Sequence, residues 1–177
     1  PINYHCFSKR ATTMKAVIFD LDMTLVDSSG LENARRSRDW KLVYSLIPTC
    51  QLYNGIESVF SFIRENKIKV CIVSTAPRPY VEKMVRYFNI PCNYIVGYHD
   101  ASPIKPHPAP MIKALELLEE PANNVVSFGD RSIDIVASKR ASIKSVGCCW
   151  GTSELQKLID SEPEQLIHDP ISIIQHI

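Results

Sequence analysis

The sequence lacks several features that would place it in a specialised class of protein. No apolar run approaches the roughly 18 residues of a membrane span, and there is no internal repeat or low-complexity segment. Lysine and arginine number 20 against 19 for aspartate and glutamate. This balance predicts no general attraction to nucleic acid or to an anionic membrane. The chain has 177 residues, 45% of them hydrophobic, which is enough to bury the core of one domain.

The cysteines and histidines also lack the spacing of a structural framework. Six cysteines are present without a CxxC pair, and the adjacent Cys148 and Cys149 are poorly placed to bridge each other. We interpret them as reduced, mostly buried thiols, which predicts a cytoplasmic protein. The five histidines are scattered without zinc-ligand spacing.

The amino-terminal segment has no apolar stretch of the kind found in a secretory signal. Met14 is the first methionine and directly precedes the first expected strand. We therefore expect residues 1–13 to be an extension outside the core. Residues 14–177 are expected to form one domain that carries a small insert at about residues 27–55.

Apolar runs alternate with helical patterns along residues 15–159. The runs are short, rich in β-branched and aromatic residues and continuously apolar, which is typical of strands covered on both faces; they are residues 15–19, 69–73, 94–96, 125–128 and 143–146. Helices are expected between them, at residues 56–65, 79–88, 109–118, 133–139 and 153–159. This alternation predicts an α/β fold, a three-layer Rossmann-like parallel sheet with helices on both faces.

Polar residues follow three of these expected strands. "FDLD" places Asp20 and Asp22 after the first, "VSTA" places Ser74 after the second, and "FGDRSID" places Asp130 and Asp134 after the fourth. Ligands of such sheets bind beyond the carboxyl ends of the strands, so if these strands are neighbours, Asp20, Asp22, Ser74 and Asp130 are expected to converge. Clustered carboxylates repel one another unless a cation lies between them. An all-oxygen ligand set favours Mg²⁺.

Lys105 lies in the proline-rich stretch "SPIKPHPAP". The prolines stiffen a loop between the third strand and the next helix. A lysine held rigidly near several carboxylates would offset their charge and could bind a phosphate group.

Four segments in this order, "DLDMT", "VSTA", "IKPHP" and "GDRSID", resemble the haloacid dehalogenase-like hydrolases, most closely the phosphoglycolate phosphatase-like branch. The resemblance covers nearly all of residues 15–159 and implies an Mg²⁺-dependent phosphatase that hydrolyses a phosphomonoester through an aspartyl-phosphate intermediate. It also implies a small phosphorylated metabolite as the substrate. The family most often has glycine where this chain has Met23; that side chain could restrict the backbone or cover part of the site.

The resemblance assigns roles residue by residue. Asp20 would be the nucleophile and Asp22 the general acid and base. Ser74 and Lys105 would stabilise the transferring phosphoryl group. Thr24 would fix the nucleophile loop and the general acid, and Thr24 and Thr75 would contact the substrate. The metal would lie among Asp20, the backbone carbonyl of Asp22 and Asp130, with Asp134 orienting this group or Lys105.

Other interpretations are open for several of these residues. Asp20 and Asp22 could be turn carboxylates, and Ser74 or Asp134 could merely cap a helix. A phosphotransferase, a phosphomutase or a non-catalytic phosphate-binding module on the same scaffold is also compatible with the sequence. Retention of Asp22 favours hydrolysis or mutase chemistry, and the short insert argues against a mutase, which must shield its intermediate from water.

The insert is too short for the full helical cap that relatives of this kind carry. "LENARRSRDWKLVYSLI" predicts one amphipathic helix, with Arg36 on the same side as Trp40. An inward guanidinium there could bind a second anion on the substrate; the alternative is a pair with Glu32, four residues earlier. A reduced cap leaves the site open to a bulky substrate or to completion by a partner chain.

Overall fold

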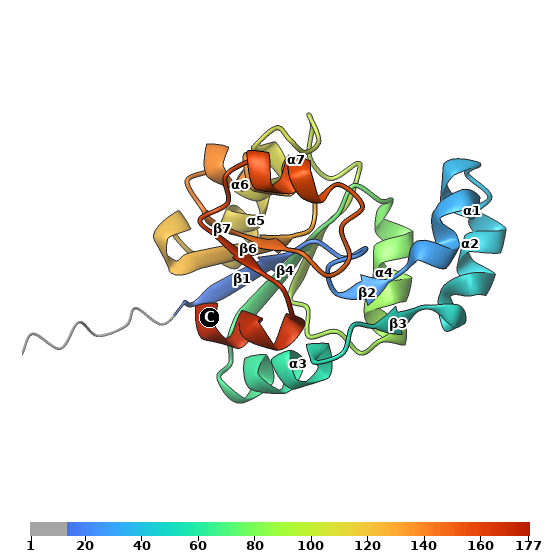
Figure 1. Cartoon of the computed structure of the whole chain (residues 1–177), viewed down its shortest axis with the longest axis horizontal. Coiled ribbons are helices and arrows are strands. Elements are labelled where there is room, and N and C mark those ends of the chain that lie inside the picture. The colour runs from blue at the N-terminus through green and yellow to red at the C-terminus, as the bar shows by residue number, and fades with distance from the viewer. Residues whose placement is uncertain (1–13) are drawn as a thin grey trace, which may run out of the picture.

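A sheet of six parallel strands forms the centre of the molecule (Figure 1). The computed structural model describes residues 14–177. Across the sheet the strands are β5 (Tyr94–Val96), β4 (Lys69–Val73), β1 (Ala16–Phe19), β6 (Val125–Gly129), β7 (Lys144–Cys148) and β8 (Gln165–Ile167). The order reverses direction at β1, which is where a parallel sheet opens a binding crevice.

β1 lies between β4 and β6, and its register sets the position of the first acidic residue. Phe19 is paired with Ile72 on one side and with Phe128 on the other. The amide of Asp20 then donates to the Phe128 carbonyl at 2.9 Å. Asp20 therefore leaves the sheet between two neighbouring strand ends and cannot move without breaking the ladder.

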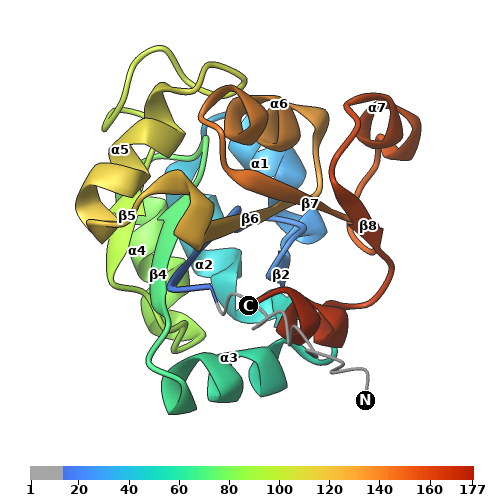
Figure 2. The ribbon, with the colours of Figure 1, turned by 90° about the vertical axis from the view of Figure 1, so that its left-hand side faces the viewer.

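Helices cover both faces of the sheet, as the sequence predicts. On one face α3 (Ile56–Glu65), α4 (Arg78–Tyr87) and the 3-10 helix η4 (Pro170–His176) share a core with β1 and β4. On the other face lie α5 (Ala109–Leu118) and α6 (Ser132–Arg140), and α7 (Leu155–Asp160) packs against α6 (Figure 2). The predicted three-layer α/β fold is confirmed.

Two parts of the sheet structure are absent from the sequence prediction. β8 is the sixth strand, and β2 (Val26–Asp27) pairs antiparallel with β3 (Gln51–Leu52) at the two ends of the insert. β8 is a three-residue edge strand with only Ile167 fully buried, and the other two strands have two residues each. Segments this short carry too little periodicity to be recognised.

The single helix predicted for residues 31–47 is wrong. The structure has a 3-10 turn η1 (Ser29–Leu31), then α1 (Glu32–Arg36), α2 (Trp40–Leu46) and a 3-10 turn η2 (Ile47–Thr49). Arg38, at φ 58°, interrupts the helix. The Asp39 side chain then caps α2 by accepting from the Leu42 amide at 3.0 Å. α1 and α2 stand beyond one end of the sheet (Figure 1).

The five cysteines within residues 14–177 are all free. In the same range no helix combines the length and apolarity that crossing a membrane requires. The extension predicted at residues 1–13 lies outside the described residues.

Candidate active site

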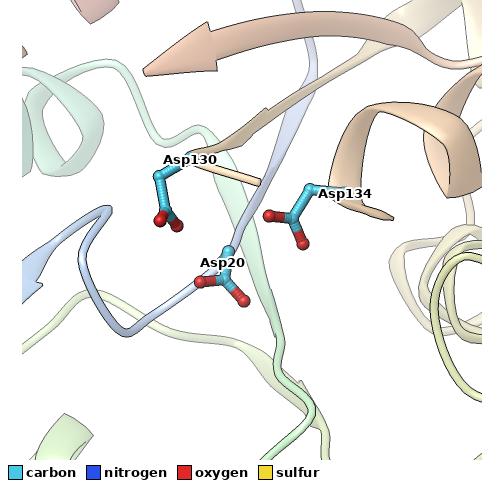
Figure 3. Close-up of side chains that lie close together, drawn as sticks. All are labelled: Asp20, Asp130 and Asp134. Atoms are coloured by element: carbon cyan, nitrogen blue, oxygen red, sulfur yellow. The ribbon is translucent and has the colours of Figure 1, made fainter. Parts of the chain in front are cut away.

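Three buried carboxyl groups meet beyond the ends of β1 and β6 (Figure 3). Asp20 follows β1, Asp130 follows β6, and Asp134 comes from the first turn of α6. Each offers one oxygen, and these oxygens lie within 4.8 Å of one another. Asp20 and Asp130 therefore lie together, as the sequence predicts, and Asp134 joins them.

Lys105 compensates part of this charge. Its Nζ donates to Asp20 Oδ1 at 2.8 Å, to Asp134 Oδ1 at 2.5 Å and to the Val73 carbonyl at 2.8 Å. Only 2% of the Lys105 side chain is exposed. All three donor positions of the ammonium group are thus directed at protein oxygens, which fixes its place between β4 and the aspartates.

The remaining charge is reflected in the pKa values of the carboxyl groups. Burial raises the pKa of Asp20 to about 7; Lys105 opposes the shift, and Asp134 and Asp22 add to it. Burial, and then the Asp20 and Asp134 carboxylates, raise the pKa of Asp130 to about 8. Burial lowers the pKa of Lys105, but Asp134 and Asp20 outweigh it and raise that pKa overall. One ammonium group does not balance three carboxylates.

Asp134 has a structural role as well as a place in the cluster. Its Oδ2 accepts from the Arg131 amide at 3.1 Å and so caps α6. A Cβ on Gly129 would overlap the Asp134 side chain, so the glycine of "GDRSID" is required by this close approach. The capping interpretation and the Lys105-orienting interpretation of Asp134 both hold. Since both of its oxygens are engaged, Asp20 and Asp130 are the better candidates for holding a cation.

Asp22 lies on the wall of the site rather than in the cluster. Its Oδ1 accepts from the Ser28 hydroxyl at 2.6 Å and from the Tyr80 hydroxyl at 2.6 Å. The same oxygen lies 2.7 Å from Arg35 Nη1. Ser28 and Arg35 belong to the insert, whereas Tyr80 belongs to α4, so Asp22 connects the insert to the body of the domain.

Sequence reasoning missed Tyr80 and Arg35. Tyr80 is fully buried, and the Arg35 guanidinium lies 5.8 Å from the centre of its ring. Burial, the Asp22 carboxylate and the hydrogen bond to it raise the pKa of the Tyr80 hydroxyl. Tyr80 lies in the first turn of the helix that follows "VSTA". Its closeness to a strand end was the sequence signal that could have marked it as a site residue.

Arg36 does not take the inward position predicted for it. Its side chain is 75% exposed, and Nη2 pairs with Glu32 Oε1 at 2.7 Å. The pair with Glu32 that the sequence left as the alternative is therefore the one present. The prediction failed because the break at Arg38 separates α1 from α2, so Arg36 and Trp40 do not share one helical face.

Thr24, Ser74 and Thr75 lie near the site in different ways. Thr24 is fully buried and is not among the residues that line the cavity described below, so it is not placed to contact a substrate as predicted. Its hydroxyl donates to Asp130 Oδ1 at 3.0 Å and so fixes Asp130, whereas the sequence prediction had it fix Asp22. The Ser74 hydroxyl accepts from the Ala76 amide at 3.0 Å. Ser74 and Thr75 both line the cavity described below.

A cavity of about 960 Å³ opens over the carboxylates. Its lining includes six carboxylate residues and four lysines or arginines, together with Trp40, Tyr98 and His99; the charged residues are Asp20, Asp22, Glu32, Asp130, Asp134, Glu154, Arg35, Arg38, Lys105 and Arg131. The predicted catalytic residues Asp20, Asp22, Ser74 and Lys105 all face it. Arg36 does not line it, and Arg35 does.

Met23 also lines the cavity and has φ 64°, in the left-handed region. Its Sδ lies 3.9 Å from the Tyr53 hydroxyl. A Cβ on Gly151 would overlap the Met23 carbonyl, so the loop after β7 packs closely against the loop that follows β1. The structure therefore combines the two interpretations of Met23: the backbone accepts a strained angle, and the side chain covers part of the site.

Curated relatives resemble parts of this chain. A pyrophosphatase PpaX from Bacillus mycoides is 33% identical over 109 residues, which are 56% of this chain and 49% of that protein. The PpaX protein of Caldanaerobacter subterraneus subsp. tengcongensis is 27% identical over 129 residues, 72% of this chain and 59% of its own length. The chain thus spans between half and three fifths of the length of these relatives.

Solved structures share the fold over nearly the whole chain. A predicted phosphoglycolate phosphatase from Haemophilus somnus superposes with a TM-score of 0.80 at 19% identity, over 92% of this chain and 97% of that one. A haloacid dehalogenase-like family protein from Streptococcus pneumoniae gives 0.76 at 20% identity, over 93% and 98%. At these identities the likeness establishes the fold alone.

The family model of the haloacid dehalogenase-like hydrolases matches residues 34–148. The match contains Ser74, Lys105, Asp130 and Asp134, and it begins after Asp20 and Asp22, whose place beside them comes from the structure. The chain belongs to the haloacid dehalogenase-like hydrolase family.

Proposed function

We propose that this chain is an Mg²⁺-dependent phosphatase that hydrolyses a small phosphorylated substrate through an aspartyl-phosphate on Asp20. One observation carries the proposal: Asp20, Lys105 and Asp130 meet on the floor of a single cavity, and Asp22 lines its wall. A module that only bound phosphate would need cationic groups in the cavity, without a set of carboxylates. A nucleophile, a proton-transfer group and a cation site together support hydrolysis.

The residues present fit a magnesium ion. The donors are carboxylate oxygens, and Lys105 leaves the buried cluster with an excess of negative charge. Asp20, Asp130 and the backbone carbonyl of Asp22 would hold the ion, while Thr24 fixes Asp130 and Lys105 fixes Asp20 and Asp134. When bound, Mg²⁺ would neutralise charge on the transferring phosphoryl oxygens.

The proposed reaction has two steps. The Asp20 carboxylate attacks phosphorus and the bond to the leaving oxygen breaks, while Asp22 gives that oxygen a proton. Water then attacks the phosphorus of the aspartyl-phosphate, Asp22 takes a proton from the water, and Asp20 is released as a carboxylate together with inorganic phosphate. Throughout, the Lys105 ammonium and the Ser74 hydroxyl would face the charge on the phosphoryl group.

The relatives and the cavity suggest which molecules to test as substrates. PpaX proteins are pyrophosphatases by name, so inorganic pyrophosphate joins small phosphomonoesters as a candidate. The insert provides α1 and α2 in place of a larger cap, which leaves the cavity accessible to such molecules. A cytoplasmic location stays a prediction from the free cysteines.

Turnover of p-nitrophenyl phosphate and pyrophosphate with purified protein tests the proposal. Activity should require Mg²⁺, disappear in chelator and return on addition of Mg²⁺. Acid quenching during turnover of ³²P-labelled substrate should leave label on Asp20. Full activity in chelator would refute the cation requirement, and label on another residue would refute the assigned nucleophile.

A further inference from the structure

One oxygen of Asp22 accepts three donors. Ser28 and Tyr80 each donate a hydroxyl hydrogen at 2.6 Å, and Arg35 Nη1 lies at 2.7 Å. Two of the donors are neutral and held by their elements: Ser28 is fully buried at the start of the insert, and Tyr80 is fully buried in α4. These contacts fix the direction of the carboxyl group in the absence of a substrate.

This arrangement restrains the residue that the proposed function needs to move protons. Because Oδ1 accepts from all three donors, the other oxygen, Oδ2, is the one left to exchange a proton with a leaving group. The contacts on Oδ1 set the direction of Oδ2, which can turn toward a leaving group only when one of them breaks. Arg35 contributes the charged donor, which is stronger than a neutral one. Of the three donors, Arg35 is therefore the one whose loss gives the Asp22 carboxyl group the most freedom to turn.

Arg35 also lines the cavity, where a substrate can reach it. Its side chain is 24% exposed, whereas the Asp22 side chain is 14% exposed. The ion pair with Asp22 is the only one recorded for Arg35 within residues 14–177. A planar guanidinium in such a place can exchange one carboxylate for another, or for a phosphate, without leaving the cavity.

We propose that Arg35 is a substrate-sensing latch: an anionic group on the leaving side of the substrate takes the guanidinium from Asp22 and so frees Asp22 for proton transfer. This inference rests on the proposed phosphatase function and narrows its substrates to phosphates whose leaving group carries a second negative charge. Pyrophosphate and carboxylated phosphate esters belong to this class. Esters whose leaving group lacks a second negative charge, such as p-nitrophenyl phosphate, leave the latch closed and should be hydrolysed more slowly.

Charge around the cavity supports this direction of selection. Lys105 and Arg131 are occupied by carboxylates, Lys105 by Asp20 and Asp134 and Arg131 by Glu154 at 3.6 Å. The lining cations on the insert side are Arg35, which is paired with Asp22, and Arg38. Arg35 is the one whose release changes the contacts of a site residue, and Arg38 is the competing anion binder.

Two aryl phosphates test the latch directly, one with a meta-carboxylate and one with the meta-carboxamide in its place. They match in size and differ in charge. In the wild type the carboxylate should be preferred. In Arg35→Met this preference, measured as the ratio of kcat/KM values, should fall about 10- to 100-fold, the equivalent of one charge-assisted hydrogen bond. Turnover of the carboxamide should rise, because Asp22 has lost its strongest restraint.

Arg36→Met is the matched control. It removes the same charge from the next position of α1, but Arg36 is exposed and paired with Glu32, so the preference should be unchanged. Arg35→Lys should restore part of the preference because it returns the charge without the planar group. Parallel loss on both esters in Arg35→Met, or an equal loss of preference in Arg36→Met, would overturn the latch. So would loss of the preference in Arg38→Met alone.

Binding separates failure of the latch from failure of the phosphatase proposal. Phosphonoacetate and ethylphosphonate are not hydrolysed and differ in one carboxylate. Calorimetry with Mg²⁺ should show that Arg35→Met weakens the binding of phosphonoacetate about 10- to 100-fold and hardly changes the binding of ethylphosphonate. This result stands even if no ester is turned over, whereas equal weakening of both ligands, or of neither, counts against Arg35.

Discussion

The floor and the insert of this site are built in opposite ways. On the floor, Asp130 and Lys105 are buried and the Asp20 side chain is 11% exposed. The pairing of β1, β4 and β6 brings these residues together from distant parts of the sequence. In the insert, α1 has five residues and α2 has seven, and Arg36 is largely exposed. The same residue type therefore has different consequences in the two regions: charge is costly on the floor and inexpensive on the insert.

The difference indicates where chemistry and selection are placed. On the floor, any change in charge alters the balance between Lys105 and the carboxylates around it. The insert contacts the proposed proton-transfer residue Asp22 through Ser28 and Arg35. Changes in the insert can alter selectivity while the floor stays intact.

Asp20→Asn should produce the largest effect. The amide cannot act as the nucleophile, so kcat on p-nitrophenyl phosphate should fall roughly 10³-fold or more while the fold persists. Circular dichroism and the melting temperature monitor the fold. Asp160→Asn, an aspartate that pairs with Gln156 on α7, is the control and should keep full activity. A variant at residue 20 with near wild-type turnover would move the nucleophile elsewhere.

Lys105→Met should have the largest effect on stability. It leaves Asp20 and Asp134 buried without their cation, and breaking a buried pair from one side costs about 3–5 kcal/mol. Urea unfolding measures the loss. The matched change Lys113→Met, on a half-exposed side chain paired with Glu116, should cost less than about 0.5 kcal/mol. Similar values for the two variants would remove the contrast between buried and exposed charge.

Stability in chelator should fall as pH rises from about 5 to about 8. The pKa values of Asp20 and Asp130 are raised to about 7 and about 8, whereas the unfolded chain titrates near 3.9. Between these values the folded state binds more protons than the unfolded state, so the free energy of unfolding decreases with pH. Thermal melts in chelator measure the slope.

Added Mg²⁺ should reduce that slope, because a cation stabilises the ionised carboxylates. Asp130→Asn keeps an acceptor for Thr24 and should flatten the curve in chelator. A metal-free protein that becomes more stable as pH rises through this window would show that the floor is not an uncompensated carboxylate cluster.

Tyr80→Phe should give the smallest of these effects. It removes one hydrogen bond to Asp22 but keeps the ring, which lies 6.2 Å from that of Trp40. A hydrogen bond to a charged group contributes about 1.5–3 kcal/mol, and Ser28 and Arg35 remain, so the expected loss in urea unfolding is near the lower value. Tyr87→Phe, an exposed tyrosine on the same helix, should be neutral. Equal stability of the two variants would show that Ser28 and Arg35 of the insert fix Asp22 without help from Tyr80.

The floor could be predicted from the sequence because strand ends have a fixed geometry. Once β1, β4 and β6 are recognised as parallel neighbours, Asp20, Ser74 and Asp130 must meet at one edge. Asp22 could not be resolved in the same way, because its partners depend on how a short insert folds back. The break at Arg38 turns on one residue with positive φ and one capping aspartate, which a helical pattern does not reveal. Tyr80 was missed because a buried tyrosine usually serves packing alone.

The central position of β1 also governs how the protein is made. β1 is synthesised first among the strands, yet its partner β6 begins at Val125, and Asp134 follows later still. A ribosome must therefore translate more than a hundred further residues before Asp20 meets Asp130 and Asp134. Pairings this distant in sequence form late. In the nascent chain the proposed nucleophile Asp20 therefore still lacks its partners, and a message cut short before α6 yields a protein that has Asp20 and Lys105 but not Asp134.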